Sequence, residues 1–536
     1  MMRKVLVLLM MLAAGATGFA QQRADYRVVP LPMSIQADTT KVFTLQQGMG
    51  IAYDKSLPEM ERNAEFLQQW VEELTGLRLQ LTPDNKKAAI QLCLSKKGKA
   101  TQGYTLQVGA KGITIQAEEA EGIFRGIQTL RKSLPAKLQT TILFPFVTLG
   151  DAPRFSYRGV HLDCARHFFS VEVIKRYLDL LALHGCNQFH WHLTDDQGWR
   201  FEVKALPDLA PKGSIRQQTV IGRNSGVFDG QPYGGYYTQE DCKEIVRYAA
   251  ERYINVIPEI DLPGHMQAAL HVYPQLGCTG GPYPVWQVWG VSSDVLCAGN
   301  PEVLTFLKTV FSELCEVFPS KLIHIGGDEC PKGRWKQCAK CQAKARELGL
   351  KDDGHSIENQ LQTYINHEME QFLRERGRSL IGWDETLEGG LTQEATVMSW
   401  RGINGGIEAA RQHHPVIMTP TDYCYIDYYQ LKSTWNEPLA IGGYVPVSKV
   451  YSFEPVPEAL TEDEQQYILG AQVNLWTEYV AAPEHLFYML LPRLDAISEV
   501  QWCRPEQKNF DDFKQRLTHM LRLYNLMGLR YGRAVE

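Results

Sequence analysis

The sequence predicts an α/β protein in which a (β/α)₈ barrel follows a smaller α+β domain. From residue 157 onward, short apolar runs alternate with helical patterns, which is typical of repeated βα units. This part holds eight candidate strands, the number that closes a parallel barrel. Polar residues follow nearly every strand, and this favours the barrel over a doubly wound open sheet.

The first 152 residues are predicted to hold a leader and the smaller domain. Arg3 and Lys4 precede a short apolar run and a stretch of small residues ending at Ala20, so residues 1–20 are interpreted as a secretory signal peptide. The apolar run is short for the alternative, a membrane anchor. Residues 21–152 then show strand patterns at 89–94, 103–108 and 112–117 and a helical pattern over 60–74.

The barrel is expected over residues 153–505, with a C-terminal helical extension over 506–536. The expected strands are 157–163, 187–193, 254–260, 322–327, 379–383, 395–400, 415–419 and 468–476. The clearest expected helices are 171–184, 239–253, 301–318 and 357–376.

Charge and cysteine content narrow the class of protein. With 55 Lys and Arg against 61 Asp and Glu, the net charge of −6 argues against a nucleic-acid binder. No later segment is long and apolar enough to span a membrane. The 12 cysteines all follow the leader, in a protein that is expected to be exported.

Two groups of cysteines could be more than buried thiols. Cys278 and Cys297 bracket a loop and are the best disulfide candidate. Cys330, Cys338 and Cys341 contain one CxxC, which could hold zinc if a fourth ligand lay nearby. A single CxxC is a weak signal, so disulfides or free thiols are the favoured interpretation.

Chemically active residue types gather where the barrel strands end. These segments are HLDCARHF (161–168), HWHLTDDQGW (190–199), PEIDLPGH (258–265), HIGGDE (324–329), GWDE (382–385), MSW (398–400), DYCYIDYY (422–429) and NLWTEY (474–479). In a barrel all of them face one rim, where active sites are built. Carboxylates, an Arg, His residues and several Trp suit a sugar ring, which stacks on aromatic faces and hydrogen-bonds through its hydroxyls.

The segment Gly326-Gly327-Asp328-Glu329 is the sharpest local signal. We expect the glycines to let a substrate approach the backbone, and adjacent acids on a strand point to opposite faces. Ordinary retaining glycosidases place two carboxyl groups about 5 to 5.5 Å apart on either side of the scissile bond. Side-by-side acids fit substrate assistance better, because only one of them protonates the leaving oxygen.

Together these motifs resemble glycoside hydrolase family 20, the β-N-acetylhexosaminidases. The resemblance covers residues 25 to 505 and rests on LDxxRHF, HWHLTDDQGW, DxPGH, HxGGDE and the WxE of Trp476 to Glu478. It implies a small α+β domain followed by a catalytic barrel. It also implies a retaining exo-enzyme that removes terminal non-reducing β-linked GlcNAc or GalNAc from oligosaccharides or glycoconjugates, without a cofactor.

The resemblance also implies roles for individual residues. Glu329 is the expected general acid/base, and Asp328 and Tyr425 hold the 2-acetamido group whose carbonyl attacks the anomeric carbon. Asp195 and His265 position Glu329 and tune its pKa. The remaining substrate-binding residues are Trp383, Trp400 and Trp476 around the acetamido methyl group, and Arg166, Asp427 and Glu478 at the sugar hydroxyls.

Three alternatives stay open on the sequence alone. The chain could be a lacto-N-biosidase-type member of the same family. It could be a metal-dependent barrel hydrolase with His190, His192, His265 and Asp328 as ligands. It could also be a sugar-binding protein without catalysis, although the intact Asp328-Glu329 pair argues against this. The oligomeric state is not predicted.

Overall fold

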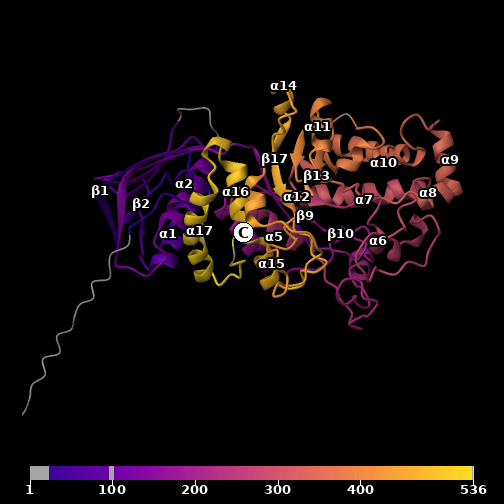
Figure 1. Ribbon diagram of the computed structural model, residues 1–536, viewed down its shortest axis with the longest axis horizontal. Coiled ribbons are helices and arrows are strands. Elements are labelled where there is room, and N and C mark those ends of the chain that lie inside the picture. The colour runs from indigo at the N-terminus through magenta and orange to yellow at the C-terminus, as the bar shows by residue number, and fades with distance from the viewer. Residues whose placement is uncertain (1–22, 96–101, 393, 534, 536) are drawn as a thin grey trace, which may run out of the picture.

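A computed structural model describes residues 23–95, 102–392, 394–533 and 535, and Figure 1 shows a sheet-containing N-terminal part beside a barrel. The helices α16 (Arg493–Trp502) and α17 (Phe510–Leu526) lie between the two parts. The predicted signal peptide lies outside the described residues. Among the helices of the described residues, none has the length and apolar character needed to cross a membrane.

The N-terminal part is a mixed seven-stranded sheet covered by two helices. In spatial order its strands are β1 (Ser34–Gln46), β7 (Thr141–Asp151), β5 (Tyr104–Gly109), β6 (Gly112–Ala117), β4 (Ile90–Leu94), β2 (Gly50–Ala52) and β3 (Gln80–Leu81). The helices are α1 (Pro58–Thr75) and α2 (Ala120–Ser133). The four elements predicted here are confirmed, whereas β1, β2, β3, β7 and α2 were not predicted.

Helix α2 was difficult to predict from the sequence because it contains two glycines, which lower helix propensity. Both glycines serve packing. A Cβ on Gly122 would lie 2.6 Å from the carbonyl oxygen of Gly103, and one on Gly126 would lie 2.5 Å from Ile115 Cγ2. The missing side chains therefore let α2 sit close against the sheet.

The second part is a closed barrel of eight parallel strands, which confirms the predicted fold class. The strands are β8 (Tyr157–Asp163), β9 (Gln188–His192), β12 (Asn255–Glu259), β13 (Leu322–His324), β14 (Ser379–Trp383), β15 (Thr396–Ser399), β16 (Val416–Met418) and β17 (Ile468–Val473). Each of the eight coincides with a predicted strand, although several end earlier. The short hairpin of β10 (Thr194–Asp195) and β11 (Gly198–Trp199) follows β9.

The four predicted barrel helices are also present, and each begins after a polar N-cap. They are α3 (Val171–Leu183), α5 (Gln239–Ala250), α7 (Pro301–Val317) and α10 (Ile357–Arg374). The side chains of Ser170, Thr238, Asn300 and Ser356 accept hydrogen bonds from backbone N–H groups of the first turns. The other helical segments are α4 (Leu209–Gly213), α6 (Gln267–Val272), α8 (Gly333–Gln337), α9 (Ala339–Glu347), α11 (Asn404–Arg411), α12 (Thr421–Cys424), α13 (Val447–Ser452), α14 (Glu462–Gln465) and α15 (Pro483–Leu490), with 3₁₀ turns at Pro274–Leu276, Asp384–Leu387 and Pro505–Gln507.

Polar contacts hold the two parts together through α16 and α17. Arg516 of α17 forms a buried ion pair with Glu499 of α16 and donates a hydrogen bond of 2.9 Å to the carbonyl oxygen of Val28. Trp502 Nε1 donates to Asp151 Oδ1 at 3.0 Å. The C-terminal helices thus pack against both the barrel and the N-terminal part.

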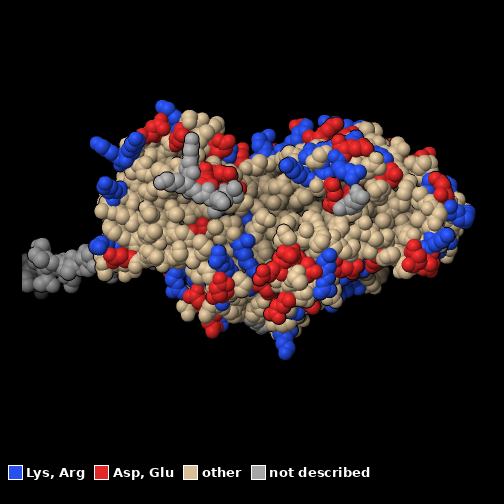
Figure 2. Space-filling view, turned by 90° about the horizontal axis from the view of Figure 1, so that it is seen from above, with Lys and Arg blue, Asp and Glu red and all other residues tan. Residues whose placement is uncertain are grey.

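The disulfide predicted between Cys278 and Cys297 is wrong, because their sulfur atoms are not bonded to each other. Their sulfur atoms instead lie beside Cys338 and Cys341, and Cys330 does not belong to this group. On the face seen in Figure 2, basic and acidic side chains are interspersed rather than segregated.

Candidate active site

A chain of ion pairs links the loops after β8, β9 and β12. Arg166 Nη2 lies 2.9 Å from Asp195 Oδ2, and Asp195 Oδ1 lies 3.1 Å from His265 Nδ1. The opposite ring atom, His265 Nε2, lies 3.9 Å from Asp328 Oδ2 and 3.7 Å from Glu329 Oε2. Predicted residues that are up to 163 positions apart in the sequence therefore form one connected polar group.

This group controls the charge of its members. Burial raises the pKa of Asp195, but the positive charges of Arg166 and His265 outweigh burial and hold that pKa well below its usual range. Burial lowers the pKa of His265, but Asp195 and Asp261 outweigh it and raise the pKa well above its usual value. His265 is therefore a cation that faces the two adjacent acids.

Glu329 has the electrostatic character of a proton donor. Partial burial and the negative charge of Asp328 raise its pKa, against the opposing charge of His265. Its side chain is still 45% exposed, so a ligand can reach it. A carboxylic acid that stays protonated to higher pH than usual is suited to general acid catalysis.

The two acids lie on one side of the chain, because the backbone leaves strand geometry after His324. The φ angles of Gly326, Gly327 and Glu329 are 65°, 99° and 45°, all in the left-handed region. The expectation that the acids point to opposite faces is therefore wrong, since both carboxylates approach the same His265 nitrogen.

The structure also corrects the reason for Gly326. We expected the glycines to admit a substrate, but a Cβ on Gly326 would lie 1.9 Å from Asp261 Oδ1. That carboxylate accepts a hydrogen bond of 3.0 Å from the N–H of Gly327. Gly326 is thus required by the close approach of Asp261, which fixes the turn that presents Asp328 and Glu329.

Four aromatic residues, at the end of β14 and in the loops after β15, β16 and β17, form a second group at the same end of the barrel. The ring centroids of Trp383 and Trp476 are 6.0 Å apart, and those of Trp400 and Tyr425 are 6.1 Å apart at an interplanar angle of 25°. Trp383, Tyr425 and Trp476 are buried in one cluster, against which Trp400 packs. The guanidinium of Arg166 lies 5.1 Å from the Trp476 ring and joins this aromatic group to the ion-pair chain.

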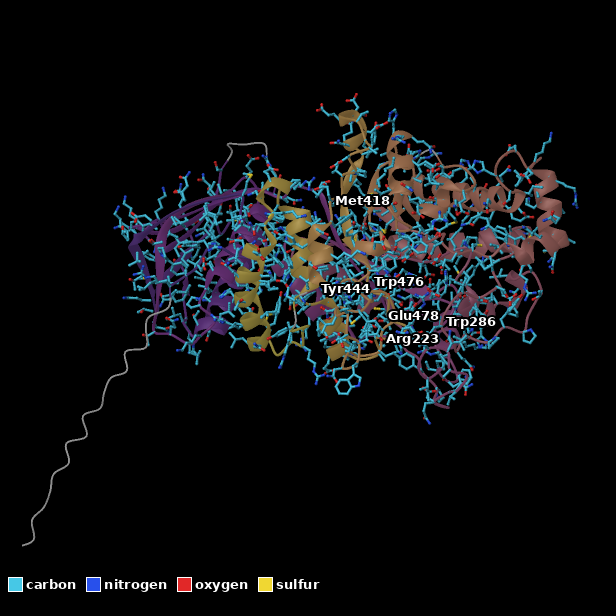
Figure 3. The ribbon with its side chains drawn as sticks, in the orientation of Figure 1. Arg223, Trp286, Met418, Tyr444, Trp476 and Glu478 are labelled. Atoms are coloured by element: carbon cyan, nitrogen blue, oxygen red, sulfur yellow. The ribbon has the colours of Figure 1, made fainter. Side chains whose placement is uncertain are left out.

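Asp427 and Glu478 border the aromatic group as two further acids. Burial raises the pKa of each, and the charge of Glu478 adds to the rise at Asp427. Arg166 acts in the opposite direction on Glu478. Figure 3 shows Trp476 and Glu478 on the same side of the barrel as Arg223 and Trp286. Arg223 lies in the loop between α4 and α5, and Trp286 lies in the loop between α6 and α7.

Several buried polar atoms of the site lack a hydrogen-bond partner within the part of the chain that the structure describes. They include Asp328 Oδ1 and Asp427 Oδ1. Buried polar atoms are almost always paired, so unpaired carboxylate oxygens beside an aromatic group are typical of a ligand site.

The residues proposed as ligands for a metal-dependent hydrolase belong to two separate groups of side chains, one around Glu259 and one around Asp261. His190 Nε2, His192 Nδ1 and His324 Nδ1 lie 3.0, 2.5 and 3.1 Å from the carboxylate of Glu259, inside the barrel. His265 and Asp328 belong to a different group, with Asp261. The four ligands proposed for that alternative therefore do not converge on one point.

The sequence reasoning missed residues that hold the predicted ones in place. Glu259 accepts a hydrogen bond of 2.9 Å from Trp383 Nε1 and so fixes the indole from below. Gln197 accepts from Arg166 Nε, and Glu385 accepts from Trp400 Nε1, both at 2.9 Å. Glu259, Gln197 and Glu385 all lie inside the strand-end segments given in the sequence analysis. Their position at strand ends was the sequence feature that could have identified them.

A (β/α)₈ barrel with an acid of raised pKa, a second acid beside it and an aromatic group at one end is typical of the class of glycoside hydrolases. The comparisons agree. The model of the glycosyl hydrolase family 20 catalytic domain matches residues 155–505, and that of family 20 domain 2 matches residues 25–152. The chain belongs to glycoside hydrolase family 20.

Known relatives extend over almost the whole chain. A beta-hexosaminidase of Porphyromonas gingivalis is 42% identical over 94% of this chain, which spans only 64% of that protein. A beta-hexosaminidase of Vibrio furnissii is 34% identical, with 89% of this chain and 77% of the relative covered. A mutant Streptomyces plicatus beta-hexosaminidase, solved in complex with product (GlcNAc), is 30% identical with a TM-score of 0.82, covering 95% and 96% of the two chains.

Proposed function

We propose that this protein is a retaining exo-β-N-acetylhexosaminidase that acts by substrate assistance on terminal β-linked GlcNAc or GalNAc of oligosaccharides and glycoconjugates. The observation that carries the proposal is the placement of Asp328 and Glu329 on one side of the chain, facing the same His265. The names of the relatives support the same activity.

In this mechanism each acid has its own task. Glu329, with its raised pKa, donates a proton to the glycosidic oxygen. The acetamido carbonyl of the substrate attacks the anomeric carbon, and an oxazolinium intermediate forms as the leaving group departs. Asp328, whose Oδ1 is unpaired, accepts the acetamido N–H and stabilises the positive charge. Glu329 then deprotonates the water that opens the intermediate, with net retention.

The other residues hold the terminal sugar. Trp383, Trp400 and Trp476 surround the acetamido methyl group, with Tyr425 as donor to its oxygen. Arg166, Asp427 and Glu478 bind the outer hydroxyls. The side chain of Glu329 is 45% exposed, whereas that of Asp328 is 12% exposed. The greater exposure of Glu329 suits a leaving group that extends toward solvent.

The test is directed at the acetamide. A β-glucoside without the acetamido group should be a very poor substrate, and a thiazoline analogue of the intermediate should inhibit with an affinity about 10²-fold or more above that of substrate. Asp328→Asn should weaken both turnover and thiazoline binding. Trapping of a covalent sugar ester on Asp328 or Glu329 by a 2-fluoro glycoside would overturn the mechanism.

A substrate panel separates the specificities within the family. Aryl β-GlcNAc, aryl β-GalNAc and an aryl lacto-N-bioside should be compared by kcat/KM. We expect turnover of the two monosaccharides. Turnover of the lacto-N-bioside alone would assign the chain to the lacto-N-biosidase type.

We also propose that the protein is exported after cleavage near Ala20, on the basis of the charged, apolar and small-residue pattern of residues 1–20. N-terminal sequencing of protein from the extracytoplasmic fraction should begin close to Gln21. Recovery of the intact chain in the cytoplasmic fraction alone would contradict this.

A further inference from the structure

Four cysteines from two distant segments bring their sulfur atoms together beside the active-site loops. Cys278 and Cys297 lie at the two ends of one loop, and Cys338 and Cys341 lie at the start of α9. The Sγ–Sγ distances are 3.8 Å from Cys278 to Cys341, 3.7 Å from Cys297 to Cys338 and 3.6 Å from Cys297 to Cys341. All four sulfurs lie within 4.8 Å of one another.

These distances fit a tetrahedral metal site and do not fit disulfides. Zinc binds thiolate sulfur at about 2.3 Å, so four sulfurs around one ion lie about 3.8 Å from each other. A disulfide requires a sulfur–sulfur distance of about 2.05 Å. Cys297 is near more than one other sulfur, which is expected for a shared centre rather than for a pair.

The backbone around the cluster is shaped to hold the sulfurs. Cys297 N donates to the carbonyl oxygen of Leu276 at 2.8 Å, which closes the base of the loop. A Cβ on Gly299 would lie 2.1 Å from the carbonyl oxygen of Lys340, so only glycine lets the two segments meet.

The surrounding charge suits a metal that is bound by four thiolates, which carries a net charge of −2. Residues 332–346 contain no Asp or Glu. The basic residues of this segment are Lys332, Arg334, Lys336, Lys340, Lys344 and Arg346. Arg334 pairs with Asp294 and Lys344 pairs with Glu347. The compensating positive charge on the segment that carries the CxxC therefore comes from Lys332, Lys336, Lys340 and Arg346.

We propose that Cys278, Cys297, Cys338 and Cys341 form a structural Zn²⁺ site. All four positions of the tetrahedron are filled by protein, which is typical of structural rather than catalytic zinc. Binding replaces the thiol protons, which are released to solvent, and involves no redox step.

The site would brace the loops that carry the active site. The N–H of Leu296 donates to the carbonyl oxygen of Pro263 at 3.0 Å, next to the segment of His265, and Trp335 Nε1 donates to the carbonyl oxygen of Leu296 at 2.9 Å. The N–H of Ser292 donates to Asp196 Oδ2 at 3.0 Å, beside Asp195. Zinc therefore ties the wall formed by residues 278–297 to the chain that follows Glu329.

The decisive experiment measures the metal in the full-length protein, purified without chelator. Elemental analysis should find about one zinc per chain, and native mass spectrometry should show the mass of one zinc ion less the protons of the thiols. After removal of zinc with a thiol reagent and then reduction, added Co²⁺ should give the intense visible absorption of tetrahedral cobalt thiolate. A metal-free protein whose mass is lower by four hydrogens would contain two disulfides, and this result would overturn the proposal. A metal-free protein with four free thiols would overturn it as well.

Variants test whether these cysteines are the ligands. Cys338→Ser and Cys341→Ser should lose zinc and lower the melting temperature, whereas Cys93→Ser and Cys315→Ser, which lie outside the cluster, should retain zinc. If the ligand variants fail to fold, the cobalt spectrum of the wild-type protein decides. Retention of a full equivalent of zinc in Cys341→Ser would overturn the assignment. These readouts are independent of the sugar specificity, so they stand or fall separately from the proposed function.

Discussion

The imidazole of His265 lies between Asp195, 3.1 Å from Nδ1, and Glu329, 3.7 Å from Nε2. Asp195 is itself paired with Arg166 at 2.9 Å. The buried pair of Arg166 and Asp195 is therefore connected to the exposed Glu329 through the His265 ring.

Replacement of His265 should change the pH profile in a defined direction. The positive charge of His265 lowers the pKa of Glu329, so His265→Gln should let that pKa rise further. The alkaline limb of kcat/KM should then move to higher pH, because removal of the positive charge favours the protonated form of the acid. A shift to lower pH would show that His265 does not act on the acid.

Loss of the Glu329 carboxyl should depend on the leaving group. Glu329→Gln should lower kcat/KM on natural disaccharides by about 10²- to 10⁴-fold, the usual contribution of general acid catalysis. Activated aryl glycosides should lose far less, because their leaving oxygen needs no proton. Equal losses on both kinds of substrate would place the acid elsewhere.

Asp195→Ala should destabilise the fold strongly, because it leaves Arg166 and His265 buried without their shared partner. Breaking a buried pair costs about 3 to 5 kcal/mol of unfolding free energy. The folded-state pKa of Asp195 is depressed, so its contribution is present above the unfolded pKa of about 3.9 and is lost as the pH falls through the folded value. Urea unfolding at neutral pH measures the effect.

Asp208→Ala is the matched control for that measurement. Asp208 pairs with Lys212 at 2.9 Å, but the two side chains are 60% and 59% exposed. Surface pairs contribute about 0 to 1 kcal/mol. A similar loss in both variants would contradict the importance of the buried pair.

Gly326→Ala should damage the active site more than an equivalent substitution elsewhere. Gly326 and Gly349 have φ angles of 65° and 67°, but a Cβ on Gly349 meets nothing within 4 Å. Gly349→Ala should therefore cost only the strain of the left-handed conformation, about 1 to 2 kcal/mol. Gly326→Ala should cost more and should also lower kcat, because the new methyl group displaces Asp261 from the turn before Asp328. Equal stability and unchanged kcat would refute this role.

The barrel could be predicted from the sequence because its strands are short apolar runs separated by well-capped helices. The convergence of the candidate-site residues could be predicted because strand ends meet at one rim, which brings together polar motifs that are far apart in sequence. The edge strand β1 could not, since most of its side chains are exposed and show no buried alternation. The grouping of Cys278 and Cys297 with the CxxC also could not, because it depends on how two loops pack and not on local spacing.

The hydrogen bond between Arg516 and Val28 joins residues that are 488 positions apart in the sequence. Such a contact closes nearly the whole chain into one loop, and its entropic cost is met only when most of the structure between has formed. Because α17 is synthesised near the end of the chain, the face of the N-terminal part that it covers stays exposed to solvent during most of synthesis. Assembly of this molecule ends with a long-range closure, so chaperone protection during translation should matter more for the early domain than its small size suggests.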